Sequence, residues 1–321
     1  MPSAERALIA RIRARSAASR SLVAGIGDDC AVLRLPKGHE FLVTTDFSLE
    51  GVHFRREWHS PAVVGHRCLT RGLSDIAAMG GEPLAVFLSL ALPAKLPQRW
   101  VDGFFDGLLA LAKSFGAPLA GGDTAQSTGG VLADILVLGS VPRGTAILRS
   151  GARPGDSLYV TGELGAGAAA LEPMLRTGRK VSAKSYPRHF HPTPRIAVGQ
   201  FLRKHALASS MIDLSDGLST DLSHLCEESH VGAELHADLV PHARIGKTRR
   251  FVDRRFALHG GDDYELLFTA RPTKKIPERI AGIPVTPIGR ITRGPGMKLV
   301  ENGRTSQLHP QGWEHFAAEN A

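Results

Sequence analysis

Hydrophobic residues occur along the chain in two patterns: short continuous runs, and runs in which apolar positions recur every three or four residues. The continuous runs at 84–92 and 131–141 have the length and composition of buried strands, and residues 41–45 form a third that ends at Asp46. The spaced pattern from Gln98 to Gly116 indicates an amphipathic helix. Because the two patterns alternate along the chain, the sequence predicts an α/β (α+β) fold.

Proline, glycine and small polar residues mark the boundaries of further elements. Ser60 and Pro61 are typical of a helix start, and this helix should end near Met79, before two glycines. Residues 8–12 carry the apolar stripe of a first helix. We also expect strands at 157–161, 211–214 and 264–269, helices at 166–176, from 195 and at 218–229, a linker at 177–194, and a hairpin turn at 302–303.

A turn-rich connector at residues 144–156 divides the chain. The sequence therefore predicts an N-terminal domain at residues 1–146 and a C-terminal α/β domain at residues 147–321. Each segment is long enough to bury a core of its own without disulfides or a structural metal.

The composition places the chain among globular proteins. Of its 321 residues 43% are hydrophobic, which excludes a disordered chain, and no apolar run reaches the roughly 18–20 residues that span a bilayer. The N-terminal residues lack the apolar core of a signal peptide. The cysteines Cys30, Cys68 and Cys226 are widely spaced, so neither a disulfide framework nor a zinc site is indicated, and we expect a cytoplasmic protein.

The net charge of +8 points to anionic partners. Nucleic acid and small phosphorylated ligands both fit the charge, but the basic residues are scattered and only 6% of residues are aromatic. A basic nucleic-acid-binding protein is therefore the non-enzymatic alternative, and it would leave the pairing of glycine with aspartate unexplained. We expect no nucleic-acid and no membrane partner.

Aspartates stand beside glycines, strand ends and loops at several points of the chain. Taken singly, each is typical of a turn or a helix cap. Taken together, they supply the hard oxygen ligands that suit Mg²⁺ bound jointly with phosphates. Asp75, on a helix whose other face is apolar, needs a partner for its carboxylate. The set comprises Asp28, Asp29, Asp46, Asp75, Asp123, Asp213, Asp216, Asp262 and Asp263.

No nucleophile and base accompany these carboxylates in a known pattern. The Walker phosphate loop fails because Pro241 replaces its first glycine, and the dinucleotide fingerprint fails at Cys30. There is no G-x-S-x-G motif, and only His189 and His191, in the expected linker, have a spacing that suits a metal. A reaction that needs metals and positioning but no activated side chain is phosphoryl transfer, so we predict a Mg²⁺-dependent enzyme of phosphorylated ligands.

Six ordered motifs resemble those of the thiamine-monophosphate kinases, within the superfamily typified by aminoimidazole ribonucleotide synthetase. The resemblance covers nearly the whole chain, from the first helix to the GWEHF segment at 312–316. The motifs are GIGDDCA at 25–31, TTD and EGVHF within 44–54, LSDIAAMG at 73–80, GGDT at 121–124, IDLSDGL at 212–218 and GGDDYEL at 260–266.

The resemblance implies a two-domain fold and a homodimer whose N-terminal sheets form a barrel. It also implies that ATP and several Mg²⁺ ions bind between the domains, and that a phosphoryl group passes directly, in line, to thiamine monophosphate as the acceptor, which yields thiamine diphosphate. The metal ligands that it implies are Asp29, Thr44, Thr45, Asp46, Asp75, Asp123, Asp213 and Asp216. The implied ATP-binding residues are Gly122, Asp123, Arg149, Ser215 and Phe105, and the implied substrate-binding residues are His53, Asp262 and Trp313.

Three positions depart from the family pattern. Gly72 replaces a usual asparagine, Ser48 replaces a common leucine, and Asp262 replaces a common glutamate with the same charge on a shorter stem. The enzymatic alternative is a ligase-like relative that phosphorylates an amide oxygen, selenide or a carbamoyl group. The selenide and hydrogenase-maturation members rely on a reactive residue near a chain end; here the first cysteine is Cys30 and the last five residues contain none.

Overall fold

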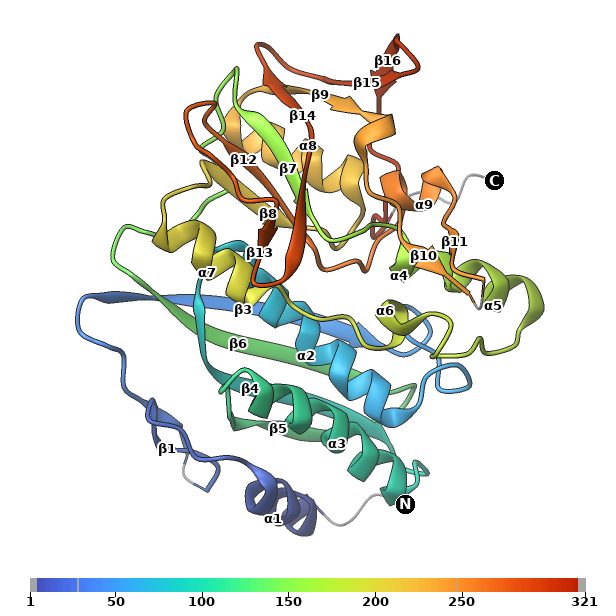
Figure 1. Cartoon of the computed structure of the whole chain (residues 1–321). Helices are drawn as coiled ribbons and strands as arrows, with labels where there is room; N and C mark the ends of the chain where they lie inside the picture. Colours follow the sequence, from blue (N-terminus) through green and yellow to red (C-terminus); the bar gives the residue numbers. More distant parts are fainter. Residues whose placement is uncertain (1–4, 28, 247, 317–321) are drawn as a thin grey trace. The chain divides into compact units, whose positions relative to one another are not determined.

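The computed structural model describes residues 5–27, 29–246 and 248–316. The chain forms two compact units, coloured along the sequence in Figure 1. Unit 1 spans residues 1–76 and 81–146, and unit 2 spans residues 77–80 and 147–321. None of the helices in the described part of the chain combines the length and the apolar character needed to cross a bilayer.

Unit 1 is built on a four-stranded sheet in the order β3-β6-β4-β5. Strands β4 and β5 are parallel, and the other neighbours are antiparallel. Two helices accompany the sheet, and the side chains of Leu69, Leu73 and Ile76 on the first of them are at most 2% exposed. The elements are β3 (His39–Leu49), β4 (Glu82–Pro93), β5 (Leu119–Ser127), β6 (Leu132–Pro142), α2 (Pro61–Ala78) and α3 (Gln98–Ser114), preceded by α1 (Glu5–Arg15), β1 (Leu22–Ala24) and β2 (Val32–Leu33).

Unit 2 contains a mixed sheet in the order β16-β15-β9-β14-β7-β12-β8, with β13 paired to β14. Its core includes Leu158, Leu222 and Leu267, all with no exposed surface. The strands are β7 (Ser157–Thr161), β8 (Ser210–Asp213), β9 (Gly232–His236), β12 (Leu266–Ala270), β13 (Arg279–Ile280), β14 (Ile283–Thr292), β15 (Met297–Glu301) and β16 (Arg304–Leu308). The other elements are α4 (Ala166–Ala169), α5 (Leu171–Thr177), α6 (Pro187–Phe190), α7 (Ile196–Lys204), α8 (Leu218–Ser229), η1 (Ala237–Leu239), β10 (Arg244–Ile245), β11 (Arg250–Phe251) and α9 (Arg254–His259).

Most elements expected from the sequence are present, and β7 and α8 have the predicted bounds. The turn between β15 and β16 is also confirmed, because Asn302 and Gly303 both have the positive φ that a type I′ turn requires. The prediction that a strand ends at Asp46 is wrong: β3 continues to Leu49, because β6 pairs with it along its whole length. Asp123 likewise lies inside β5, not after a strand.

Two expectations for unit 2 are also wrong. The single helix predicted at 166–176 is divided into α4 and α5. Pro173 lies in the first turn of α5, where its missing N–H costs nothing, whereas it could not continue the ladder of a longer helix. The segment 177–194 is not a simple linker, since it contains α6, and the side chains of His189 and Phe190 have no exposed surface.

Candidate functional site

A cavity of about 590 Å³ lies within unit 1 and is the natural place for an aromatic ligand. Apolar side chains of α1, α3 and β4 line part of the cavity, and glycine-rich backbone with carboxylates, here called the rim, lines the rest. Three residues expected to bind ATP line it, Gly122, Asp123 and Phe105, together with the expected metal ligand Asp29. The structure therefore brings these four together.

The rim of this cavity depends on Gly122. Its φ is +143°, and an added Cβ would lie 1.9 Å from the carbonyl oxygen of Leu88. Only glycine fits there, so the β5 backbone can lie close against β4. The next residue, Asp123, accepts a hydrogen bond from the Thr124 backbone N–H at 2.8 Å, which orients one carboxylate oxygen.

Sequence reasoning missed the contribution of α1 to this cavity. Ile9 and Ile12 line it, and ion pairs from Arg11 to Asp102 and from Arg15 to Asp106 hold α1 against α3. The apolar stripe at residues 8–12 was visible in the sequence but indicated only a helix. Only the tertiary structure shows that this stripe faces a cavity as well as the hydrophobic core.

A second group of expected metal ligands lies where β3 meets α2. The Thr44 hydroxyl donates a hydrogen bond to a carboxylate oxygen of Asp75, which is the partner that Asp75 needed. Successive strand residues face opposite sides of a sheet, so Asp46 shares the face of Thr44. Thr45 lies on the other face and is exposed, so its side chain does not join this group.

The expected substrate residue in unit 1, His53, lies in the turn that follows β3. Its Nδ1 atom accepts a hydrogen bond from the Leu49 backbone N–H at 3.0 Å. In the neutral imidazole the proton is then on Nε2, which can donate to a ligand.

In unit 2, three segments far apart in the sequence meet through backbone hydrogen bonds. The Asp262 N–H donates to the Ser215 carbonyl at 2.8 Å, and the Trp313 N–H donates to the Asp216 carbonyl at 3.0 Å. Asp213 ends β8 directly before this turn and is 4% exposed. The structure therefore brings together five predicted residues of different assigned roles.

Arg149 does not join this group within unit 2. Its carbonyl accepts a hydrogen bond from the Ser229 hydroxyl at 2.6 Å, at the C-terminal end of α8. Ser215 precedes the N-terminal end of the same helix, and a helix of this length spans roughly 18 Å. The remaining member of the aspartate set, Asp28, lies outside the described residues.

Asp221 is a carboxylate that sequence reasoning did not select. It lies on α8 and accepts hydrogen bonds from the backbone N–H groups of Asp216 and Gly217. Burial, together with the neighbouring charges of Asp213 and Asp216, raises the pKa of Asp221 to about 8. Its position in the first turn of a helix did not indicate that its side chain would bind the backbone of the turn that carries Asp216.

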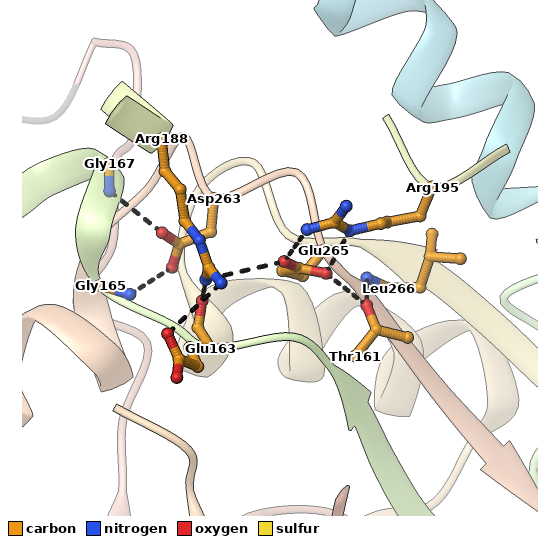
Figure 2. A network of polar contacts seen from close by, with 9 residues as sticks. All are labelled: Thr161, Glu163, Gly165, Gly167, Arg188, Arg195, Asp263, Glu265 and Leu266. Atoms are coloured by element: carbon orange, nitrogen blue, oxygen red, sulfur yellow. Dashed lines mark hydrogen bonds and ion pairs between the residues drawn. The ribbon is translucent and has the colours of Figure 1, made fainter. Parts of the chain in front are cut away.

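A polar network in unit 2, shown in Figure 2, lies directly beside Asp262 in the sequence. Glu265, 1% exposed, accepts hydrogen bonds from Arg195 at 2.7 and 2.5 Å and from the Thr161 hydroxyl at 2.7 Å. Asp263 accepts from the N–H groups of Gly165 at 2.6 Å and Gly167 at 3.1 Å. The pairing is what makes burial of these carboxylates tolerable.

The environment of Asp263 has opposing effects on the pKa of its carboxyl group. Burial raises the pKa of Asp263 to about 7, although the hydrogen bonds from Gly165 and Gly167 lower it. Arg188 lies between the carboxylates: it donates to the Glu163 carbonyl at 2.7 Å and lies 4.0 Å from Glu265. The network thus anchors the segment that follows Asp262.

The expected metal ligands fit Mg²⁺ by chemistry, since all of them offer oxygen atoms. Across residues 5–27, 29–246 and 248–316, no three His, Cys, Asp or Glu side chains are gathered closely enough to hold an ion by themselves. Mg²⁺ commonly binds one or two carboxylates of a protein and completes its shell with waters and substrate phosphates.

Comparison with known proteins adds an independent finding. Residues 27–141 match the family model of the AIR synthase related protein N-terminal domain, and residues 153–302 match the model of the C-terminal domain. The thiamine-monophosphate kinase of Salmonella typhimurium is 38% identical, over 99% of both chains. The crystal structure of thiamine-monophosphate kinase from Stenotrophomonas maltophilia is 37% identical, with a TM-score of 0.80 over 95% of this chain and 99% of that one. A structure of AaThiL complexed with AMPPCP and TMP is 31% identical, with a TM-score of 0.76 over 88% and 89%.

Proposed function

We propose, from the premise that this chain belongs to the thiamine-monophosphate kinases of the AIR synthase related family, that it phosphorylates thiamine monophosphate with ATP to give thiamine diphosphate. It is a phosphotransferase with a phosphate group as acceptor. The expectation of an α/β (α+β) fold of the aminoimidazole ribonucleotide synthetase type is confirmed.

One observation supports the nucleotide site best. The cavity of unit 1 combines an apolar wall, suited to a purine ring, with a rim at which Gly122 exposes backbone beside two carboxylates. We assign the adenine to the apolar part, which Phe105 lines, and the phosphates to the rim. In unit 2 we assign Ser215 to ATP binding from its motif. We assign Arg149 to ATP binding from its place in the motif pattern alone.

The acceptor explains why no side-chain base is needed. A phosphate monoester has a second pKa near ~6 and is largely ionised at neutral pH, so it already carries the attacking oxygen as an anion. The task of the protein is to bring two polyanions together in line. Asp29, Thr44, Asp46, Asp75 and Asp123 in unit 1, with Asp213 and Asp216 in unit 2, would hold Mg²⁺. Thr45 would join them only through its backbone oxygen, because its side chain lies on the other face of β3.

When bound, Mg²⁺ would supply positive charge against the phosphate oxygens, the principal contribution to phosphoryl transfer. The chain's own residues orient the acceptor. His53 can donate from Nε2, Asp262 offers a carboxylate, and Trp313, 53% exposed, presents a ring on which the cationic thiazolium can stack.

The test of this function is a panel of acceptors. Purified protein with ATP and Mg²⁺ should convert thiamine monophosphate to thiamine diphosphate and release ADP in equal amount, as followed by chromatography. Carbamoyl, selenide and amide acceptors, which the ligase-like alternative would use, should give no acceptor-dependent ADP. Turnover of one of these in place of thiamine monophosphate would refute the assignment.

We also propose that the chain forms a homodimer through the sheet of unit 1. Strand β3 is an edge of that sheet, and its alternate residues Phe41, Val43 and Phe47 are 48%, 62% and 54% exposed. An apolar stripe on an edge strand favours association, and a second copy of the same sheet can cover it. This supports the barrel that the family resemblance implies.

The dimer predicts a simple measurement. Light scattering after size exclusion should give twice the mass of the chain, and Val43→Glu, which places a charge in the stripe, should give the monomer mass with an unchanged circular dichroism spectrum. Glu40→Ala, at an exposed polar position near the start of the same strand, is the control and should remain dimeric. A monomeric unsubstituted protein would refute the proposal.

We assign the enzyme to the cytoplasm and expect no nucleic-acid or membrane partner. The thiols of Cys30, Cys68 and Cys226 are all free, which fits a reducing compartment. Burial raises the pKa of the Cys68 and Cys226 thiols to about 12, so both are inert at neutral pH.

A further inference from the structure

The backbone around Asp262 adopts an unusual conformation. Asp262 has φ +65° and Tyr264 has φ +52°, so two non-glycine residues on either side of Asp263 occupy the left-handed region. Side chains disfavour this region, and such residues persist where the surrounding structure fixes them. Residues in this backbone region also concentrate at functional sites.

Contacts on both sides hold the segment in place. Asp263 and Glu265 turn into the polar network, where the N–H groups of Gly165 and Gly167 and the Arg195 guanidinium bind them (Figure 2). The Tyr264 N–H donates to the Leu214 carbonyl at 2.8 Å. The backbone that carries Asp262 is therefore fixed before any ligand arrives.

Tyr264 fixes the side chain of Asp262 as well. Its hydroxyl donates a hydrogen bond to Asp262 Oδ1 at 2.6 Å, and its ring is 1% exposed. Because the buried ring cannot turn away, the hydroxyl holds one carboxylate oxygen in a set direction. A hydrogen bond to an ionised acceptor is stronger than one between neutral groups, and it favours the charged form.

We propose that Tyr264 is a positioning residue, which holds the Asp262 carboxylate in the orientation that binds the amino group on the pyrimidine end of the acceptor. The inference rests on the proposed function, in which Asp262 meets that acceptor.

The test is Tyr264→Phe, which keeps the ring and removes only the hydroxyl. The KM for thiamine monophosphate should rise about tenfold, as expected for loss of a hydrogen bond to a charged group. The KM for ATP and kcat should stay within about twofold of the parent, a split that general damage to the fold would not give. The matched control is Tyr159→Phe on β7, whose ring stacks on Phe268 in the same sheet and which should leave both KM values unchanged.

A double-mutant cycle shows whether Tyr264 acts through Asp262. Asp262→Asn should raise the acceptor KM by itself, and adding Tyr264→Phe to it should raise that KM no further, because the group being positioned has already changed. Independent, additive effects would overturn the proposal, and so would equal changes in the KM for ATP and for the acceptor.

The same double-mutant cycle distinguishes failure of the positioning role of Tyr264 from failure of the assigned contact between Asp262 and the acceptor. If Asp262→Asn raises the acceptor KM and Tyr264→Phe does not, the positioning role is wrong while the acceptor assignment stands. If Asp262→Asn leaves the acceptor KM unchanged, the assigned contact of Asp262 and the role of Tyr264 are both wrong. Asp262→Asn keeps the Tyr264 ring in place, so its result is informative whatever the stability of Tyr264→Phe.

Discussion

Asp75→Asn is expected to abolish phosphoryl transfer while leaving the chain folded. The amide oxygen of asparagine can still accept the hydrogen bond that the Thr44 hydroxyl donates to Asp75, so the junction of β3 and α2 keeps its contact. What disappears is one negative charge from the group that would hold Mg²⁺. Loss of such charge stabilisation in the transition state lowers kcat by about a thousandfold or more.

Asp46→Asn should have an effect of the same size, because Asp46 shares the Thr44 face of β3. Steady-state rates at ordinary and at high Mg²⁺, with thermal unfolding curves, measure both variants. Glu82→Gln, at an exposed carboxylate at the start of β4, is the control and should keep full activity. Near-normal turnover in either Asp46→Asn or Asp75→Asn would refute the metal assignment.

Free thiamine is expected to be a far poorer acceptor than thiamine monophosphate, by about a thousandfold in kcat/KM, the usual contribution of a general base. A hydroxyl acceptor must lose a proton as it attacks, and the chain has no predicted base to take it. The phosphate of thiamine monophosphate needs no such help, because it is already an anion at neutral pH. It also brings negative charge to a site suited to polyanions.

Competition between the two acceptors in one reaction gives the ratio of their kcat/KM values directly. With free thiamine as the sole acceptor, ADP should form about a thousandfold more slowly than it does with thiamine monophosphate. Rapid phosphorylation of free thiamine would overturn the acceptor assignment and would require a base that the sequence did not reveal.

The sequence by itself determined the class of fold, most of its elements and the types of residue at the site. Periodicity was sufficient for β7 and α8, because each buries one regular face in its core. Carboxylates and glycines at fixed motif positions predicted oxygen ligands for a metal and backbone suited to phosphates. These features are local: they can be predicted from the sequence wherever residues close along the chain determine the conformation.

Only the tertiary structure decided which of these residues meet. Strand β3 continues past Asp46 because β6, distant in sequence, pairs with it, and that pairing separates Thr44 from Thr45 by face. The apolar stripe of α1 lines a cavity because the tertiary fold places the helix beside α3, to which two ion pairs join it. Tyr264 reaches Asp262 because both residues take a left-handed backbone that buried contacts of the following carboxylates enforce. Convergence of side chains depends on long-range pairing and backbone angles, which the local sequence does not specify.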